Sequence, residues 1–417
     1  MSIPSPSIAV IGGGLAGLSA AITVAKEGAS CTLFEAAPQL GGRTSSWQPA
    51  ADGTTVDHGP HLLLGCYHHL LALMAHAGAS NNIHWQESLT LPLWSADRGH
   101  FALTPKPWLP LQIALPIAVT NLPGHDLQSL TALIRLTTSP PSPNESVQQW
   151  LQRNHIPPPL IRDLLEPLCL GSMNEGITSA NGESFATVLN LAFSSHQNGR
   201  IGWFRHPLSI SLITPLESYA RQLGVTIHTR CRIRTVQPHS VASQSREYRG
   251  YDKIILAIPA KARNRLLSIE GSVESRSITN YHLWFDHHLA MPSPLVGGIG
   301  TVGQWFFDID AMTNKRSTTH HYCIVISDAH SHHGELYNTL IRELSAVADT
   351  EILSPVAHKR VTIHHATHPV RNTTPPALPP SIVDSCEQPL PGELPATMER
   401  AVATGYNAAM SALQYRH

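Results

Sequence analysis

Charged side chains are scarce in this 417-residue chain: Asp, Glu, Lys and Arg together make up 14% of it, and the formal net charge is −1. A protein that binds the phosphate backbone of a nucleic acid needs a basic surface, so nucleic acid is not an expected partner. The six cysteines are scattered without C-x-x-C spacing, which predicts reduced thiols in a reducing compartment.

Long apolar runs and metal-binding motifs are also missing. No window contains 18 uninterrupted apolar residues, so a membrane-spanning helix is not expected. The chain starts with MSIPSPS, which lacks the basic region of a signal peptide, and this predicts a cytoplasmic protein. The 26 histidines include several adjacent pairs, but the H-E-x-x-H spacing does not occur, and we predict no metal site.

A nucleotide-binding pattern occupies residues 8–43. A short apolar run is followed by Gly12, Gly14 and Gly17 in G-x-G-x-x-G spacing, then by a helical pattern and a second apolar run that ends in Glu35. The first glycine permits a tight turn, the second lets a pyrophosphate approach the backbone, and the third lets helix and strand pack closely. An acid at the end of the second strand accepts hydrogen bonds from a ribose. The pattern therefore predicts a dinucleotide site, because a strand, a turn, a helix, a second strand and an acid follow one another in this order.

Strand-like patterns return in the second half of the chain. Residues 224–228 and 231–236 form an alternating pair, and residues 254–258 are continuously apolar. A continuous apolar run is typical of a strand buried on both faces of a parallel sheet, so we expect it to rejoin the first sheet. Residues 394–413 have the pattern of a final helix.

A chain of this length is too long for one compact core, so we expect two interleaved domains. Residues 1–80, 201–270 and 361–417 are assigned to a discontinuous nucleotide-binding domain. Residues 81–200, which combine proline-punctuated apolar stretches with helical patterns, and residues 271–360 are assigned to a substrate domain.

The residues that follow Glu35 indicate which dinucleotide binds. Residues 40–43 read Leu-Gly-Gly-Arg. This run resembles the pattern of flavoproteins related to amine oxidases and carotenoid desaturases, where it lies along the cofactor. FAD is therefore the expected cofactor. No Cys or His matches a flavin-attachment motif, so we expect non-covalent binding. Cys386 lies close to the predicted cofactor region.

Three further stretches carry a more specific resemblance. Residues 56–67 read VDHGPHLLLGCY, residues 165–174 read LEPLCLGSMN, and residues 394–402 read LPATMERAV. In this order they resemble the squalene-associated flavoproteins, the hydroxysqualene dehydroxylases of hopanoid biosynthesis. The chain departs from that pattern at His58 and Pro60, where the family has Asn and Gln.

The resemblance implies both a fold and an activity. The implied fold is α/β, a Rossmann-like FAD-binding domain with an interleaved substrate domain of mixed helices and strands, as in flavin amine oxidases. The implied reaction is reduction of hydroxysqualene to squalene, by loss of an allylic hydroxyl and delivery of hydride from the reduced flavin. Only one dinucleotide fingerprint is present, so an external donor such as NADPH is expected to reduce the flavin.

Candidate catalytic residues are Asp57, His61 and Glu166. Asp57 and His61 follow the glycine-arginine turn and are expected near the flavin ring, where Asp57 either protonates a leaving hydroxyl or holds the loop through an Asx turn. Glu166 is either an acid whose pKa is raised by an apolar lining or an ordinary helix-terminal carboxylate. Asn174 either caps a turn or bonds a substrate oxygen.

Several cofactor contacts are predicted outside the fingerprint. A helix beginning at Pro395 or Ala396 would direct backbone N–H groups of Thr397 and Met398 toward the negative charge of a reduced flavin. By resemblance, Ile233 contacts the adenine and Asp384 bonds the ribityl or pyrophosphate part. The complete predicted set is Gly12, Gly13, Gly14, Leu15, Ala16, Gly17, Glu35, Gly41, Gly42, Arg43, Ile233, Asp384, Thr397 and Met398.

Two alternative functions stay open, an oxidative desaturase of the carotenoid type and a non-catalytic flavin- or lipid-binding protein. A C30 isoprenoid substrate is almost insoluble, so we expect the chain to dock as a peripheral protein on a bilayer, at the inner face of the cytoplasmic membrane. Residues 108–119, rich in apolar side chains and broken by prolines, are the candidate patch. Its competing interpretation is packing in the core or in a substrate tunnel.

Overall fold

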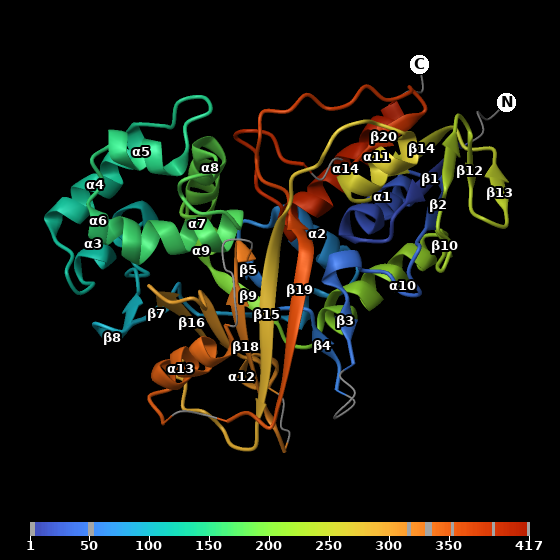
Figure 1. Cartoon of the computed structure of the whole chain (residues 1–417). Coiled ribbons are helices and arrows are strands. Elements are labelled where there is room, and N and C mark those ends of the chain that lie inside the picture. The colour runs from blue at the N-terminus through green and yellow to red at the C-terminus, as the bar shows by residue number, and fades with distance from the viewer. Residues whose placement is uncertain are drawn as a thin grey trace.

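A parallel sheet forms the nucleotide-binding part in the computed structural model, which describes residues 5–48, 54–314, 318–329, 336–351, 354–385 and 388–414. Its five strands lie in the order β10-β2-β1-β14-β20, and every neighbouring pair is parallel (Figure 1). The strands are β1 (Ser7–Ile11), β2 (Ser30–Phe34), β10 (Thr226–His228), β14 (Lys253–Leu256) and β20 (Ile382–Asp384).

The predicted return of the chain to this sheet is confirmed. Strand β14 pairs with β1 in register Ile8↔Lys253, and its Ile254, Ile255 and Leu256 are fully buried. The prediction that residues 224–228 and 231–236 form a pair is wrong. Strand β10 pairs instead with β2, because that partner offers a buried parallel edge, and residues 235–237 join a separate three-stranded sheet. That sheet comprises β11 (Thr235–Gln237), β12 (Ser240–Ala242) and β13 (Glu247–Arg249).

Helices α1 (Leu15–Lys26) and α14 (Met398–Gln414) pack closely beside the parallel sheet. A Cβ added at Gly405 would lie 2.0 Å from the Ala16 carbonyl oxygen, so a glycine permits this close approach. The Ser19 hydroxyl donates to the Val402 carbonyl oxygen over 2.8 Å. The remaining helices of this part are α2 (His68–His76), α10 (Thr214–Gln222), which continues a π-helical turn over Ser209–Ile213, and α11 (Ala260–Leu267).

A seven-stranded sheet in the order β19-β15-β18-β17-β16-β7-β8 forms the second large layer (Figure 1). Its neighbours are antiparallel except for β16 and β7. Helix α13 (Tyr337–Val347) contributes Leu340, Ile341 and Leu344 to the core of this part. The strands are β7 (Leu91–Ser95), β8 (Gly99–Leu103), β15 (Arg276–Phe285), β16 (Leu295–Ile299), β17 (Trp305–Asp308), β18 (His320–Ile326) and β19 (Ala357–Thr367), and α12 (Ile309–Thr313) follows β17.

Helices between β8 and β9 form a separate lobe, at the left of Figure 1. Trp150 and Phe185 are buried in its core together with the leucines of the neighbouring helices. The helix predicted around residues 160–173 forms, with a π-helical turn over Ile161–Leu165 near its start. The lobe comprises α3 (Leu111–Thr120), α4 (Leu127–Thr138), α5 (Val147–Arg153), α6 (Pro158–Leu160), α7 (Glu166–Met173), α8 (Gly182–Ala192) and α9 (His196–Gly199).

Short strands connect the layers. One small sheet has the order β5-β9-β6, and β3 pairs with β4. Their bounds are β3 (Ser46–Trp47), β4 (Val56–Asp57), β5 (Leu62–Leu64), β6 (Ile83–Trp85) and β9 (Ile201–Phe204). The mixed α/β fold is thus as predicted, while the exact domain boundaries stay a prediction. Within the described ranges, no helix is both long and apolar enough to cross a bilayer.

Candidate functional site

A cavity of about 1030 Å³ is lined by the parallel sheet, the seven-stranded sheet and the helical lobe. Most residues predicted for the site line it: Gly12, Gly13, Gly14, Leu15, Ala16, Glu35, Gly41, Gly42, Arg43, His61, Ile233, Thr397 and Met398. Four predicted residues do not: Gly17, Asp57, Glu166 and Asp384. The fold therefore brings together segments that are almost 400 residues apart in the chain.

The first glycines form a turn that side chains would block. Gly12 has a φ of 107°, and a Cβ there would lie 2.2 Å from the Ala257 carbonyl oxygen. At Gly17 a Cβ would lie 1.8 Å from the Gly12 carbonyl oxygen, so this residue packs helix α1 against the turn rather than facing the cavity. At Gly14 a Cβ would meet nothing closer than 4.0 Å. The turn is therefore closed behind and open toward the cavity.

Backbone N–H groups fix the carboxylate of Glu35. It accepts hydrogen bonds from the Gly13 N–H over 2.7 Å and from the Ala37 N–H over 2.6 Å. Glu35 follows β2 directly and lines the cavity. Its oxygens are thus held beside the glycine turn, where the sequence pattern predicts a ribose ligand.

The second glycine pair is joined to the first. Gly41 and Gly42 have φ values of 114° and 56°, in the left-handed region that glycine adopts readily. The Gly41 N–H donates to the Gly13 carbonyl oxygen over 2.8 Å. The Arg43 guanidinium donates to the Ala366 carbonyl oxygen over 2.7 Å, which ties this loop to β19.

The last helix starts two or three residues later than the predicted Pro395 or Ala396. Helix α14 begins at Met398, because the Thr397 hydroxyl accepts a hydrogen bond from the Arg400 N–H over 3.1 Å and so caps the helix. Thr397 and Met398 both line the cavity, so the positive end of the helix dipole still lies there.

Asp384 does not face the cavity. It forms a buried ion pair with Arg263, and the next residue, Ser385, lines the cavity instead. Strand side chains alternate between faces, and Asp384 is the last residue of β20. Cys386 lies outside the described residues.

Asp57 is half-buried, and it contacts other parts of the protein rather than the large cavity. Its Oδ1 accepts hydrogen bonds from the Ser46 hydroxyl over 2.6 Å and from the Leu208 N–H over 2.8 Å. Burial raises the pKa of this carboxyl to about 6, although both hydrogen bonds act in the opposite direction. Asp57 lines a second cavity of about 320 Å³, which shares Gly59 and Pro60 with the large one. These contacts favour the loop-holding alternative.

His61 is the one member of the three catalytic candidates that lines the large cavity. Burial, together with the positive charges of Arg43 and His58, lowers the pKa of its imidazole to about 4. The ring is therefore neutral near pH 7. Glu166 starts α7 and does not line the cavity, whereas the following Pro167 and Leu168 do.

One part of the cavity wall is apolar and draws on both the helical lobe and the seven-stranded sheet. The sequence indicated an apolar lining for the helical segment only, because the contributing strands are far apart in the chain. The apolar wall includes Leu62, Leu64, Leu89, Leu91, Leu103, Leu164, Leu168, Val188, Leu189, Phe193, Ile201, Ile278, Phe307, Val325 and Ile363. We refer to this region as the apolar arm.

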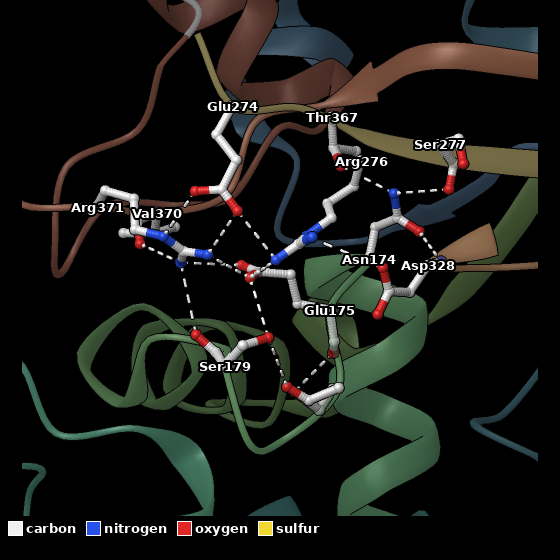
Figure 2. Close-up of polar contacts among 12 residues, drawn as sticks. Asn174, Glu175, Ser179, Glu274, Arg276, Ser277, Asp328, Thr367, Val370 and Arg371 are labelled. Carbon is white, nitrogen blue, oxygen red and sulfur yellow. Dashed lines mark hydrogen bonds and ion pairs between the residues drawn. The ribbon is translucent and has the colours of Figure 1, made fainter. Parts of the chain in front are cut away.

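A buried polar network supports the wall where α7 ends (Figure 2). Asn174 ends the helix with a φ of 53°, and its side-chain amide donates to the Thr367 hydroxyl over 2.9 Å. The adjacent Glu175 is fully buried, with Oε1 2.9 Å from Arg371 Nη2 and 3.4 Å from Arg276 Nη2. The network thus ties the helical lobe to the ends of β15 and β19, and no local sequence pattern indicated it.

Among the described residues, no group of three or more His, Cys, Asp or Glu side chains is arranged to hold a metal ion. A cavity that combines backbone turns of glycine, an acid after the second strand and an apolar arm is typical of a dinucleotide site joined to a small-molecule pocket.

Comparisons with known proteins agree with this geometry. The chain matches the family of flavin containing amine oxidoreductases over residues 15–413. It is 25% identical to a hydroxysqualene dehydroxylase of Zymomonas mobilis, over 97% of this chain and 99% of that protein. It is 28% identical to a carotenoid phi-ring synthase of Streptomyces griseus, over 72% of this chain and 63% of that protein.

Among solved structures, a cyclohexylamine oxidase from Brevibacterium oxydans superimposes with a TM-score of 0.67 at 16% identity, over 99% of both chains. A likeness at this identity supports the fold. The family match extends over nearly the whole chain, and we conclude that this protein belongs to the flavin containing amine oxidoreductases.

Proposed function

We propose that this flavin-dependent oxidoreductase removes the hydroxyl group of hydroxysqualene and forms squalene, a step of squalene and hopanoid biosynthesis. The observation that carries this proposal is the single cavity that joins a glycine-lined turn to an apolar arm. The near full-length similarity to a hydroxysqualene dehydroxylase supports the same substrate class.

FAD fits the glycine-lined end of the cavity, since the turn at Gly14 leaves open space where a side chain would otherwise stand. We propose that it binds non-covalently. Gly12, Gly13 and Gly14 would face the pyrophosphate, Glu35 the ribose, and the start of α14 the pyrimidine edge of the flavin. When bound in reduced form, FAD supplies a hydride to the substrate.

The proposed reaction replaces a C–OH bond with a C–H bond, consumes a proton and a hydride, and releases water. The apolar arm would keep bulk water from the electron-deficient carbon that forms as the hydroxyl leaves. His61 would face the reacting groups as a neutral imidazole, able to donate one N–H, while Asp57 positions the loop that carries it. The G-x-G-x-x-G spacing recurs at Gly298, Gly300 and Gly303, but there it connects the antiparallel strands β16 and β17 and leads into no helix. The first glycine turn is thus the one dinucleotide fingerprint in the described residues, and we propose an external reductant such as NADPH.

Anaerobic incubation of the reduced, flavin-loaded protein with hydroxysqualene tests the proposal. Squalene should appear in step with flavin oxidation. Absence of squalene, with flavin that stays reduced, would refute it. The alternative with a specific observation behind it is an oxidative desaturase, given the similarity to a carotenoid phi-ring synthase. Reduction of the oxidised flavin by phytoene would support that alternative instead.

We further propose that the protein draws its substrate from a bilayer surface at helices α3 and α4. Of the eight large apolar side chains exposed in the described part of the chain, five lie on or beside these two helices: Trp108, Ile113, Ile117, Leu127 and Ile134. Residues 105–140 contain only Lys106, Asp126 and Arg135 as charged groups. An exposed apolar patch with few charges favours a membrane surface.

The patch adjoins the apolar arm. The Leu111 side chain packs against Gly199, and His196 Nε2 lies 2.7 Å from the Leu109 carbonyl oxygen. Gly199 and Phe193 line the cavity, so one short segment separates the patch from the arm. The sequence-based patch needs a correction, however: Leu111 and Leu115 are buried in the core, because α3 turns that face toward the lobe.

Co-sedimentation with phosphatidylethanolamine–phosphatidylglycerol vesicles tests the docking surface with the double variant Ile113→Asp/Ile117→Asp. Full burial of one such side chain contributes about 1.5–3 kcal/mol, so losing two half-exposed ones should weaken partitioning roughly thirtyfold. Ile210→Asp, which changes an exposed isoleucine outside the patch, is the matched control. A folded, flavin-loaded double variant that still sediments fully would exclude this surface.

A further inference from the structure

Asn280 is a buried amide on the floor of the large cavity. It lies in the middle of β15, is 2% exposed, and lines the cavity. Within the described part of the structure, no protein group hydrogen-bonds its side-chain amide, whose atoms are open to the cavity rather than fully enclosed. Both the donor and the acceptor of this amide are therefore available to whatever fills the cavity.

The surroundings of Asn280 offer it no partner. Its register neighbour in β18, Val325, lines the cavity, as do Ile278 two residues earlier in β15 and Ile363 in β19. The preceding residue in the strand, Thr279, faces away, and its hydroxyl lies 3.0 Å from the Thr362 hydroxyl. Asn280 is thus a polar side chain on an apolar part of the cavity wall. Its available hydrogen-bond partner is the molecule that fills the cavity.

Asn280 also lies against the loop that carries His61. A Cβ added at Gly59 would come within 2.6 Å of both the oxygen and the nitrogen of the Asn280 amide, so only glycine allows this approach. The loop is held in place from the other side, where His282 Nε2 lies 3.2 Å from the His58 carbonyl oxygen. Because Gly59, Pro60 and His61 line the same cavity, the amide is fixed between this loop and the apolar arm.

An amide has a donor and an acceptor side by side, and an alcohol needs one of each. A hydrocarbon needs neither. We propose that Asn280 binds the hydroxyl group of the substrate and makes the site select an isoprenoid alcohol over the corresponding hydrocarbon. The identity of the alcohol in this inference rests on the proposed function. The choice of Asn280 rests on its buried amide, which no protein group hydrogen-bonds.

Equilibrium binding tests the proposal without turnover. Hydroxysqualene and squalene are titrated separately into the oxidised, flavin-loaded protein, and binding is followed through the flavin absorbance. Wild type should prefer the alcohol by at least tenfold, because an unpaired buried amide would oppose the hydrocarbon. In Asn280→Leu the preference should fall to within about twofold, mainly through weaker binding of the alcohol.

Ile278→Val is the matched control. It trims the same cavity wall without changing its polarity, so it should weaken binding of the alcohol and of the hydrocarbon alike and leave their ratio at the wild-type value. Asn280→Ala, which removes both the donor and the acceptor, serves if the leucine variant does not fold, and it should also lower the preference. An unchanged preference in either variant would overturn the proposal. A changed FAD dissociation constant with an unchanged preference would assign Asn280 to the cofactor instead.

Failure of the proposed function gives a different result. In that case wild type binds neither C30 compound, and the same titrations are made with farnesol and the matching hydrocarbon, farnesene. A preference for farnesol that Asn280→Leu abolishes would retain the role of Asn280 with a shorter alcohol. No preference in wild type would overturn it.

Discussion

Asp57 makes the free energy of unfolding depend on pH, and a single substitution at this position measures that contribution. Its carboxyl has an ordinary pKa of 3.8, and burial raises the pKa in the folded protein to about 6. The folded state therefore binds this proton more tightly than the unfolded state. Its contribution to stability is fully present below pH 3.8 and is lost as the pH rises through about 6. A shift of about two units corresponds to roughly 3 kcal/mol.

Asn at position 57 keeps an oxygen that can accept from Ser46 and Leu208 but cannot ionise. We expect Asp57→Asn to gain stability relative to wild type by about 2 kcal/mol between pH 4.5 and pH 7.5, because most of the shift lies in that interval. Urea unfolding of the flavin-loaded proteins, followed by tryptophan fluorescence, measures the difference at each pH. Asp349→Asn, at an exposed position, should show no such change. A difference for Asp57→Asn that is constant with pH, or that grows toward acid, would refute the reasoning.

Three further outcomes are expected. Glu35→Ala should raise the FAD dissociation constant by about 10- to 150-fold, since roughly 1.5–3 kcal/mol of hydrogen bonding to a charged acceptor is removed. Flavin titration of the apoprotein measures this constant, and Glu27→Ala, at an exposed site, should leave the constant unchanged. Glu175→Ala should lower the unfolding free energy by about 3 kcal/mol, because it removes a fully buried carboxylate and its ion pairs with Arg276 and Arg371. Glu217→Ala, in a half-exposed ion pair, should cost under about 1 kcal/mol in the same urea titration. Acid precipitation should release all yellow colour into the supernatant; colour that stays in the pellet would contradict non-covalent binding.

The sequence predicted the structure best where an element depends on residues that are close together in the chain. The run from β1 to Glu35 is contiguous, and its glycine spacing defines a turn whatever lies elsewhere in the chain. Strand β14 was predictable because burial on both faces leaves a continuous apolar run. The start of α14 was misplaced, since a proline at residue 395 is a weaker signal than the capping hydroxyl of Thr397.

Much of the cavity depends on contacts that no local pattern records. Glu175 meets Arg371 across 196 residues of chain, and Asp57 meets Leu208 across 151. Asn280 lies in a strand whose apolar pattern gives no sign that one polar side chain faces a ligand. The role of Asp57 likewise depends on partners that approach only in the folded protein, so its residue type alone left two alternatives open.

The order of strands in the parallel sheet has a consequence for how the protein is made. Strand β1 pairs with β14, about 245 residues later, and the edge strand β20 is added only after residue 381. At ribosomal rates of roughly 5–20 residues per second, β20 leaves the ribosome roughly 20–75 seconds after β1. During that time the apolar strands β1 and β2 lack part of their sheet, and pairings of long sequence separation form slowly. We therefore expect the nascent chain to need chaperone protection, and the flavin to be incorporated only when synthesis is nearly complete.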